Sequence, residues 1–177
     1  IHPILGTSIV FHPLASILEE QGINCLGFQY KGFDRDEPFH KSIEDMASSF
    51  CESIQEMITD TEKNLTIMGY SMGAFVAYAL VKELENKGYR CKLILLDRGI
   101  SNSLDSGSEQ HQQLLVQHLK GAALSFTPEM EARALALVKH NLAIQQHYTL
   151  QPSAIRASIL ALEAQQANRK VSMKAWK

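Results

Sequence analysis

Short apolar runs alternate with stretches of helical hydrophobic spacing along the first hundred residues. Apolar residues recur at helical spacing from Ile9 to Leu18, and Gly22 then stands where a glycine ends many helices. The run Ile23–Phe28 is short, apolar and followed by a loop containing glycine, so it predicts a buried strand. The alternation of the two patterns begins here.

The same alternation continues through a capped helix and two further strands. Ser42, with Asp45 three residues later, is close to a capping box and predicts the start of a helix. The apolar stripe of this helix is Ile43, Met46, Ala47, Phe50, Ile54, Met57 and Ile58. The elements predicted after it are a strand at Leu65–Met68, a helix from Met72 to Lys87 before Gly88, and a buried strand at Cys91–Asp97. Strands and helices at this spacing predict an α/β fold with a parallel sheet covered on both faces.

The pattern changes at Gly99 to polar sequence rich in Ser and Gln. Helices are predicted at 112–119 and 128–146, and Thr127 before Pro128 is a good start for the second. A strand-like run resumes at Ile155–Leu160. An insertion of this length is typical of an active-site lid, so residues 99–148 are predicted to form a lid within a single domain that spans 1–177.

Composition narrows the classes of protein to consider. The 177 residues are 45% hydrophobic, with a net charge of −2 and a pI near 6.4. One core is therefore expected, without the basic surface that nucleic acid requires and without an apolar run of about 18 residues to cross a membrane. The three cysteines lack tight spacing, which favours buried free thiols and a reducing cytoplasm over a disulfide or metal cluster.

Both ends of the chain read as interrupted. Ile1 resembles the last residue of a strand that enters a loop, and Lys177 follows no terminating signal. The sequence is therefore interpreted as a domain truncated at both ends, a point that bears on its chemistry.

The run Gly69–Gly73, with the sequence GYSMG, stands between the predicted strand Leu65–Met68 and the next helix. A strand that turns so tightly into a helix leaves no room for flanking side chains, so both flanking residues are glycine and the serine is strained. This strain points the hydroxyl of Ser71 into open space. The sequence therefore predicts a nucleophile elbow in which Ser71 is the nucleophile.

The serine needs a base to take its proton, and the base needs an acid to fix its tautomer. Functional groups of a parallel sheet gather at the carboxyl ends of the strands. Asp97 ends the strand that follows the elbow, so it is the predicted acid. Glu163 is the alternative, because it follows the next predicted core strand.

The base is expected beyond Lys177. In this order of catalytic residues the histidine comes after the acid and the last core strands, and none of the seven histidines stands there. Four lie in or directly beside the predicted lid helices, two follow no strand end, and one lies in the first loop. In that order they are His111, His118, His140 and His147, then His12 and His40, then His2.

An oxyanion hole needs two backbone N–H donors. One is expected from Met72, because the positive end of the elbow helix and its unpaired N–H groups lie beside the serine. The other is expected from the loop His2–Gly6, where Gly6 permits a tight turn, and Ile4 is the predicted donor.

These motifs together resemble the thioesterase domains that end nonribosomal peptide synthetases and polyketide synthases. The segments that carry the likeness are His2–Gly6, Phe11–Leu14, Gly69–Ala74 and Leu95–Asp97. The resemblance covers nearly the whole chain and implies an α/β-hydrolase fold, with a mostly parallel sheet, flanking helices and a helical lid insertion. Within it, Tyr78 stands where the family often has Glu, and Leu5 replaces a common Gly.

The resemblance also implies a reaction. Ser71 would be the nucleophile, Asp97 the acid, and Ile4 and Met72 the oxyanion donors. The implied substrate is an acyl or peptidyl chain on the phosphopantetheine thiol of a carrier protein, a partner expected in the same synthase. Ser71 would take the chain as an ester, and water or a nucleophile of the chain would release it. No metal and no bound organic cofactor are implied.

Two other functions fit the same pattern. A free-standing editing thioesterase has the same fold, and its acid usually follows the later strand, which would select Glu163 over Asp97. A non-catalytic binding domain of α/β-hydrolase type is the third interpretation, because no histidine stands in the position of the base. Sequence beyond Lys177 would decide, since a Gly-x-His-like loop there supports an enzyme.

Overall fold

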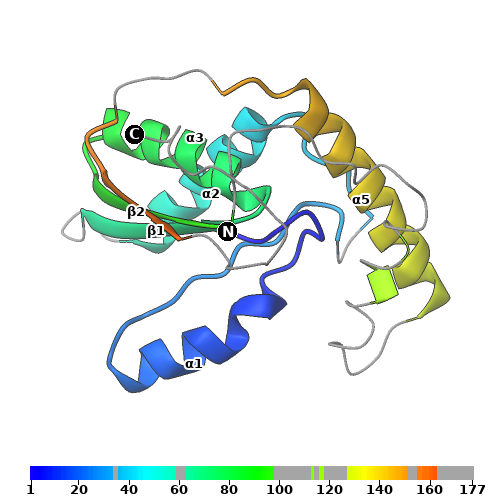
Figure 1. The fold of residues 1–177 in the computed structure, drawn as a ribbon, viewed down its shortest axis with the longest axis horizontal. Helices are drawn as coiled ribbons and strands as arrows, with labels where there is room; N and C mark the ends of the chain where they lie inside the picture. The colour runs from blue at the N-terminus through cyan, green and yellow to red at the C-terminus, as the bar shows by residue number, and fades with distance from the viewer. Residues whose placement is uncertain are drawn as a thin grey trace.

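The computed structural model describes residues 1–33, 36–58, 63–97, 113, 116–117, 127–150 and 155–162. Its strands β1 (Asn64–Tyr70), β2 (Arg90–Leu96) and β3 (Ser158–Leu162) form one parallel sheet in the order β1-β2-β3. The helices are η1 (Ile9–Phe11), α1 (His12–Glu20), α2 (Ile43–Met57), α3 (Gly73–Asn86) and α5 (Pro128–His147). Figure 1 shows α2 and α3 on one side of the sheet and α1 on the other. The predicted α/β architecture with a parallel sheet is confirmed.

The register of the sheet brings the carboxyl ends of its strands level. Tyr70 pairs with Leu96, and Leu96 pairs with Leu162. At the free edge of β1, the Ile1 nitrogen donates to the Met68 carbonyl and the Tyr70 N–H donates to the Ile1 carbonyl. These two bonds follow the pattern of a parallel ladder, as expected for a residue at the end of a strand.

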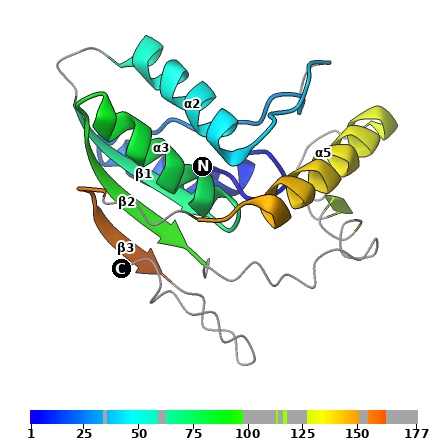
Figure 2. The ribbon, with the colours of Figure 1, turned by 90° about the horizontal axis from the view of Figure 1, so that it is seen from above.

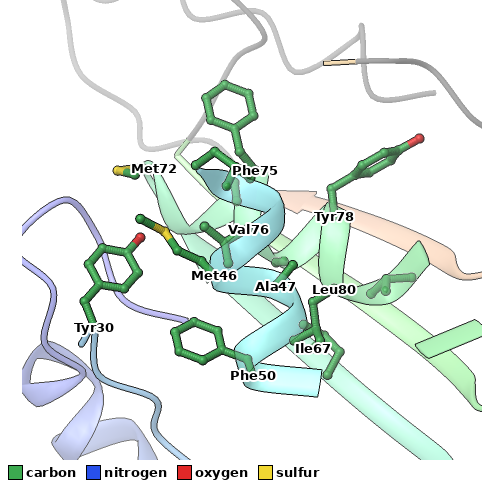
Figure 3. Packing of buried hydrophobic residues seen from close by; sticks show 14 of the residues in the cluster. Tyr30, Met46, Ala47, Phe50, Ile67, Met72, Phe75, Val76, Tyr78 and Leu80 are labelled. Atoms are coloured by element: carbon green, nitrogen blue, oxygen red, sulfur yellow. The ribbon is translucent and has the colours of Figure 1, made fainter. Parts of the chain in front are cut away.

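The core lies between the sheet and α2, with α3 in the middle (Figures 2 and 3). In Figure 3, Phe75, Val76 and Leu80 of α3 lie beside a row of α2 side chains that includes Met46 and Phe50. Each of these large side chains is almost fully buried, and burial of one contributes roughly 1.5–3 kcal/mol. The elbow helix is therefore held firmly from both sides.

Helix α2 begins as the sequence predicts. The Ser42 hydroxyl accepts from the Asp45 N–H at 3.1 Å, and the Asp45 carboxylate accepts from the Lys41 N–H at 2.8 Å. Five residues of the expected stripe are buried, while Ile58 is half-buried and Met57 is 63% exposed. Met57 is the last residue of α2, where the helix has passed the surface it covers, so its burial was predicted wrongly.

Helix α1 ends at the predicted glycine. Gly22 has a φ of +75°, and the Ile23 N–H donates to the Leu18 carbonyl while the Gly22 N–H donates to that of Glu19. This pair of bonds is a Schellman motif.

The predicted buried strand at Ile23–Phe28 is wrong. The segment is extended, but no strand is assigned to it, and Ile23 and Leu26 are 51% and 53% exposed. Its short apolar composition and the glycine-containing loop after it indicated a strand, whereas membership of a sheet depends on a partner elsewhere in the chain.

Helix α5 confirms the helix predicted at 128–146. The Thr127 hydroxyl caps it by accepting from the Met130 N–H at 3.3 Å, and Pro128 opens its first turn. Most of the first predicted lid helix, 112–119, and the polar opening of the insertion lie outside the described residues.

The burial of the cysteines and of β3 agrees only in part with the burial predicted from the sequence. Cys51 and Cys91 are buried free thiols, while Cys25 is half-buried. On β3, Leu160 and Leu162 are about half exposed, so the described residues cover the outer face of the sheet only in part. Among the helices described, none has the length and apolar content needed to cross a membrane.

Candidate active site

The candidate nucleophile and the candidate acid lie next to each other at the carboxyl edge of the sheet. Ser71 follows β1 and Asp97 follows β2, and the two strands are paired up to Tyr70 and Leu96. The Ser71 N–H donates to the Leu96 carbonyl at 3.0 Å, and the Asp97 N–H donates to the Leu162 carbonyl at 2.8 Å. Both residues are half-buried, so each is partly open to solvent.

Backbone strain marks the same two residues. Among the described residues, Ser71 (φ +54°) and Asp97 (φ +48°) are those other than glycine that have positive φ. For a serine, this conformation costs about 1–3 kcal/mol and persists only where the surrounding structure imposes it. The ladder bonds on either side and the docking of α3 impose it here. The strain predicted at Ser71 is confirmed, while that at Asp97 was not foreseen.

The two glycines of the elbow are required by close contacts. A Cβ on Gly69 would lie 2.3 Å from the Gly73 carbonyl oxygen and 2.7 Å from the Ala77 Cβ. A Cβ on Gly73 would lie 2.4 Å from the His2 carbonyl oxygen. Gly73 therefore allows the backbone of the first loop to lie directly against the start of α3.

That first loop forms a tight turn. The Gly6 N–H donates to the Pro3 carbonyl at 3.0 Å, and Gly6 has a φ of +79°, which favours glycine. Ile4 stands inside this turn, and its side chain is buried. Met72, the other predicted oxyanion donor, is the N-cap of α3 and is also buried. The backbone that leads into the turn, at Ile1 and His2, lies against Gly73 at the start of α3.

His2 is buried next to the turn. Its Nδ1 lies 2.8 Å from the Pro3 carbonyl oxygen, and because a carbonyl only accepts, Nδ1 carries the proton. Burial lowers the pKa of His2 to about 3, so the imidazole is neutral near pH 7. The rings of Tyr30 and Phe50 lie edge-on to it, and burial also lowers the pKa of the nearby His40.

Helix α5 packs against this turn through side chains that the sequence analysis did not single out. The Asn141 side-chain amide donates to the Ile4 carbonyl at 2.8 Å, and both groups are buried. One turn earlier, the Leu137 side chain fills the space beside Gly6, where a Cβ would lie 2.5 Å from Leu137 Cδ2. The His140 Nε2 donates to the His40 carbonyl at 2.7 Å. Asn141 is 137 residues from Ile4, so sequence patterns offered no signal for this contact.

Several candidates fall outside the region described. Glu163, the alternative acid, lies outside the described residues, as do His111 and His118. In the described part, no cluster of three or more His, Cys, Asp or Glu side chains is arranged to hold a metal ion. A surface cavity lined by Glu85, Tyr89 and Arg156 lies at the amino end of β2, away from Ser71.

Comparison with known proteins identifies a family and several relatives of this chain. A model of the thioesterase domain family matches residues 1–170. Atromentin synthetase of Tapinella panuoides is 29% identical over 94 residues, which cover 53% of this chain and 10% of the synthetase. The chain thus spans about a tenth of the length of such curated relatives.

Solved structures share the fold at low sequence identity. The Vlm2 thioesterase domain, solved with a bound dodecadepsipeptide, superposes with a TM-score of 0.73 at 23% identity, covering 94% of this chain and 74% of that one. The type II thioesterase BorB of the borrelidin cluster gives a TM-score of 0.66 at 21% identity, covering 91% and 69%. These similarities establish the α/β-hydrolase type of fold predicted for the chain.

Proposed function

This chain belongs to the thioesterase domain family, and we propose that it releases an acyl or peptidyl chain from a carrier protein through an ester on Ser71. The observation that carries the proposal is the conformation of Ser71, a serine with positive φ between a parallel strand and a helix N-terminus. A strained serine at this place exposes its hydroxyl to an incoming carbonyl.

The proposed chemistry has two halves. Ser71 Oγ attacks the thioester carbonyl and gives its proton to a histidine that is expected beyond Lys177, while the Ile4 and Met72 N–H groups bind the oxyanion. The carbon–sulfur bond then breaks, and the histidine returns the proton to the thiolate. Asp97 holds the histidine in its working tautomer. Water, or a nucleophile of the chain itself, attacks the ester in the second half and frees Ser71.

The proposed partner is a carrier protein domain in the same synthase, which presents the substrate on phosphopantetheine. Support comes from the synthetase that aligns with this chain, whose length exceeds the aligned region about tenfold. Since the substrate arrives on the arm of the carrier, the proposal requires no metal and no bound organic cofactor.

Release of a thiol from a model substrate tests this function. The intact protein that contains this chain is mixed with acyl thioesters of N-acetylcysteamine, and thiol release is followed over time. We expect turnover that saturates with substrate and scales with protein concentration. An intact protein that releases no thiol from these thioesters or from an acylated carrier would favour the binding-domain alternative.

We also propose that residues 99–148 act as a lid that selects the acyl chain. An apolar stripe runs along α5, in which Ala134, Leu137, Val138 and Leu142 are buried, Leu135 is half-buried and Met130 is exposed. Leu135 is therefore the member of the stripe best placed to meet a substrate, whereas Val138 belongs to the core.

Trimming the two side chains should have different effects. Leu135→Ala is expected to shift the preferred acyl length by about two carbons or more with little change in Tm, since each buried CH₂ of the substrate contributes roughly 0.8 kcal/mol. Val138→Ala is the matched control and should lower Tm by several degrees, on the order of 1 kcal/mol of stability, without that shift. Rates across a series of acyl lengths, together with thermal melts, measure both effects. An unchanged length profile in Leu135→Ala would argue against a pocket on this side of α5.

A further inference from the structure

The orientation of the proposed oxyanion donor depends on the peptide that contains it. The Ile4 N–H belongs to the Pro3–Ile4 peptide, which is planar and trans, so the direction of the Pro3 carbonyl fixes the direction of the N–H. That carbonyl accepts two hydrogen bonds, from the Gly6 N–H at 3.0 Å and from His2 Nδ1 at 2.8 Å. His2 is thus half of the clamp on this peptide.

The next peptide is held from α5. The Ile4 carbonyl, which belongs to the Ile4–Leu5 peptide, accepts from the Asn141 side-chain amide at 2.8 Å. Two consecutive peptides of the turn are therefore held by two buried side chains. His2 holds the first from within the loop, and Asn141 of α5 holds the second. The Leu137 side chain closes the remaining space beside Gly6.

We infer that His2 and Asn141 are positioning residues of the oxyanion hole, which orient the Ile4 N–H toward the oxygen that gains charge in the reaction. This inference rests on the proposed function for its catalytic consequence, while its structural part, the clamping of the turn, stands on geometry alone. A preorganised donor stabilises the transition state because it does not have to reorient as charge develops. Helix α5 accordingly contributes to the chemistry as well as covering the site.

The His2 side chain suits this role in its protonation state. A neutral imidazole with the proton on Nδ1 donates to the Pro3 carbonyl without placing a positive charge beside the Ile4 N–H. Its surroundings, the Tyr30 and Phe50 rings, are uncharged near pH 7 and hold the imidazole edge-on.

The test compares oxygen and sulfur substrates in the intact protein. A p-nitrophenyl acyl ester and its thiono analogue, in which sulfur replaces the carbonyl oxygen, differ in how well they accept hydrogen bonds from the oxyanion hole. His2→Leu and Asn141→Leu are each expected to lower kcat for the ester by roughly 10- to 100-fold, less than full removal of a donor, while KM changes less than about threefold. The ester-to-thiono rate ratio is expected to fall by roughly tenfold.

Two further variants separate positioning from general damage. His2→Asn keeps an N–H near the position of Nδ1 and should restore most of the rate. His140→Leu removes a different side-chain hydrogen bond of α5, which is made to the His40 carbonyl and not to the turn. It should leave the ester-to-thiono rate ratio unchanged. Equal losses for both substrates, or the same effect in His140→Leu, would show a merely structural role and overturn the inference.

Amide hydrogen exchange provides a readout that does not depend on activity. The Gly6 amide, which donates to the Pro3 carbonyl, should exchange at least about tenfold faster in both leucine variants than in the wild type. Where a leucine variant fails to fold, alanine at the same position removes the donor without adding bulk or charge, and His2→Asn is the comparison that keeps a donor. Unchanged exchange at Gly6 overturns the inference even if the protein proves to be a thioesterase. Faster exchange in a protein that releases no thiol would instead leave the clamp standing and reject the proposed function.

Discussion

Replacing Ser71 by alanine is expected to abolish thiol release and covalent labelling of the protein. The hydroxyl of Ser71 is the atom proposed to form the ester, and loss of a serine nucleophile lowers kcat by roughly 10⁶-fold in comparable enzymes. A fluorophosphonate should add one label to each wild-type molecule and none to the variant. Intact mass and peptide mapping of the labelled protein measure both results.

Ser48 provides the matched control for this experiment. Its hydroxyl lies on α2, partly buried, and donates to the Glu83 carboxylate at 3.0 Å, so it is a serine without access to the site. Ser48→Ala should keep the label and the rate. A label on any residue other than Ser71, or none in an active protein, would overturn the assignment of the nucleophile.

The fold should tolerate the Ser71 change. Alanine has a Cβ like serine and adopts positive φ at a similar cost, and the bonds that impose this conformation come from the backbone of Leu96 and Ala74. A loss of activity in Ser71→Ala with an unchanged melting curve therefore reports on chemistry.

The structure around Ser71 could be predicted from local signals in the sequence. The strand, glycine-flanked turn and helix around Ser71 lie in one continuous segment, from Asn64 to Asn86, and each step of their formation depends on near neighbours. The caps at Ser42 and Thr127 are local as well, and both form as predicted. Because these local preferences agree with one another, the sequence predicts this part of the structure correctly.

Long-range partners explain what could not be predicted. Ile23–Phe28 has the composition of a strand, yet whether it pairs depends on a distant edge. The bond from Asn141 to the Ile4 carbonyl joins positions 137 residues apart that share no pattern, and the sequence around Asn141 predicts only a helix. The hydrogen bond that holds the proposed oxyanion loop from α5 is therefore a product of tertiary packing that periodicity does not encode.

The backbone geometry supports the proposed role of Asp97 as the acid, and nothing in the sequence indicated this geometry. Asp97 has a φ of +48°, at the level of Ser71 across the paired strands, and its N–H is bonded to the carbonyl of Leu162 on β3. Strained residues cluster at functional sites because the surrounding structure must hold them there. The two strained residues of the described chain are thus the proposed nucleophile and the proposed acid.

Asp97→Asn is expected to lower turnover by about 10⁴-fold while the fold is retained. Asparagine adopts positive φ as readily as aspartate, so the backbone at this position should not change. The amide, however, presents a donor where the base requires an acceptor, and the histidine then takes the wrong tautomer. Steady-state rates with the acyl thioester, alongside a thermal melt, measure the effect.

Glu163→Gln tests the alternative acid. Only one carboxylate can orient the base, so only one of the two substitutions should cause a large loss of activity. If Asp97 is the acid, Glu163→Gln should change the rate by less than about tenfold, since its loss leaves the catalytic hydrogen bond in place. The opposite ranking, with the larger loss in Glu163→Gln, would move the acid to the end of β3. It would also favour an editing thioesterase over a domain that ends a synthase, because the position of the acid separates the two interpretations.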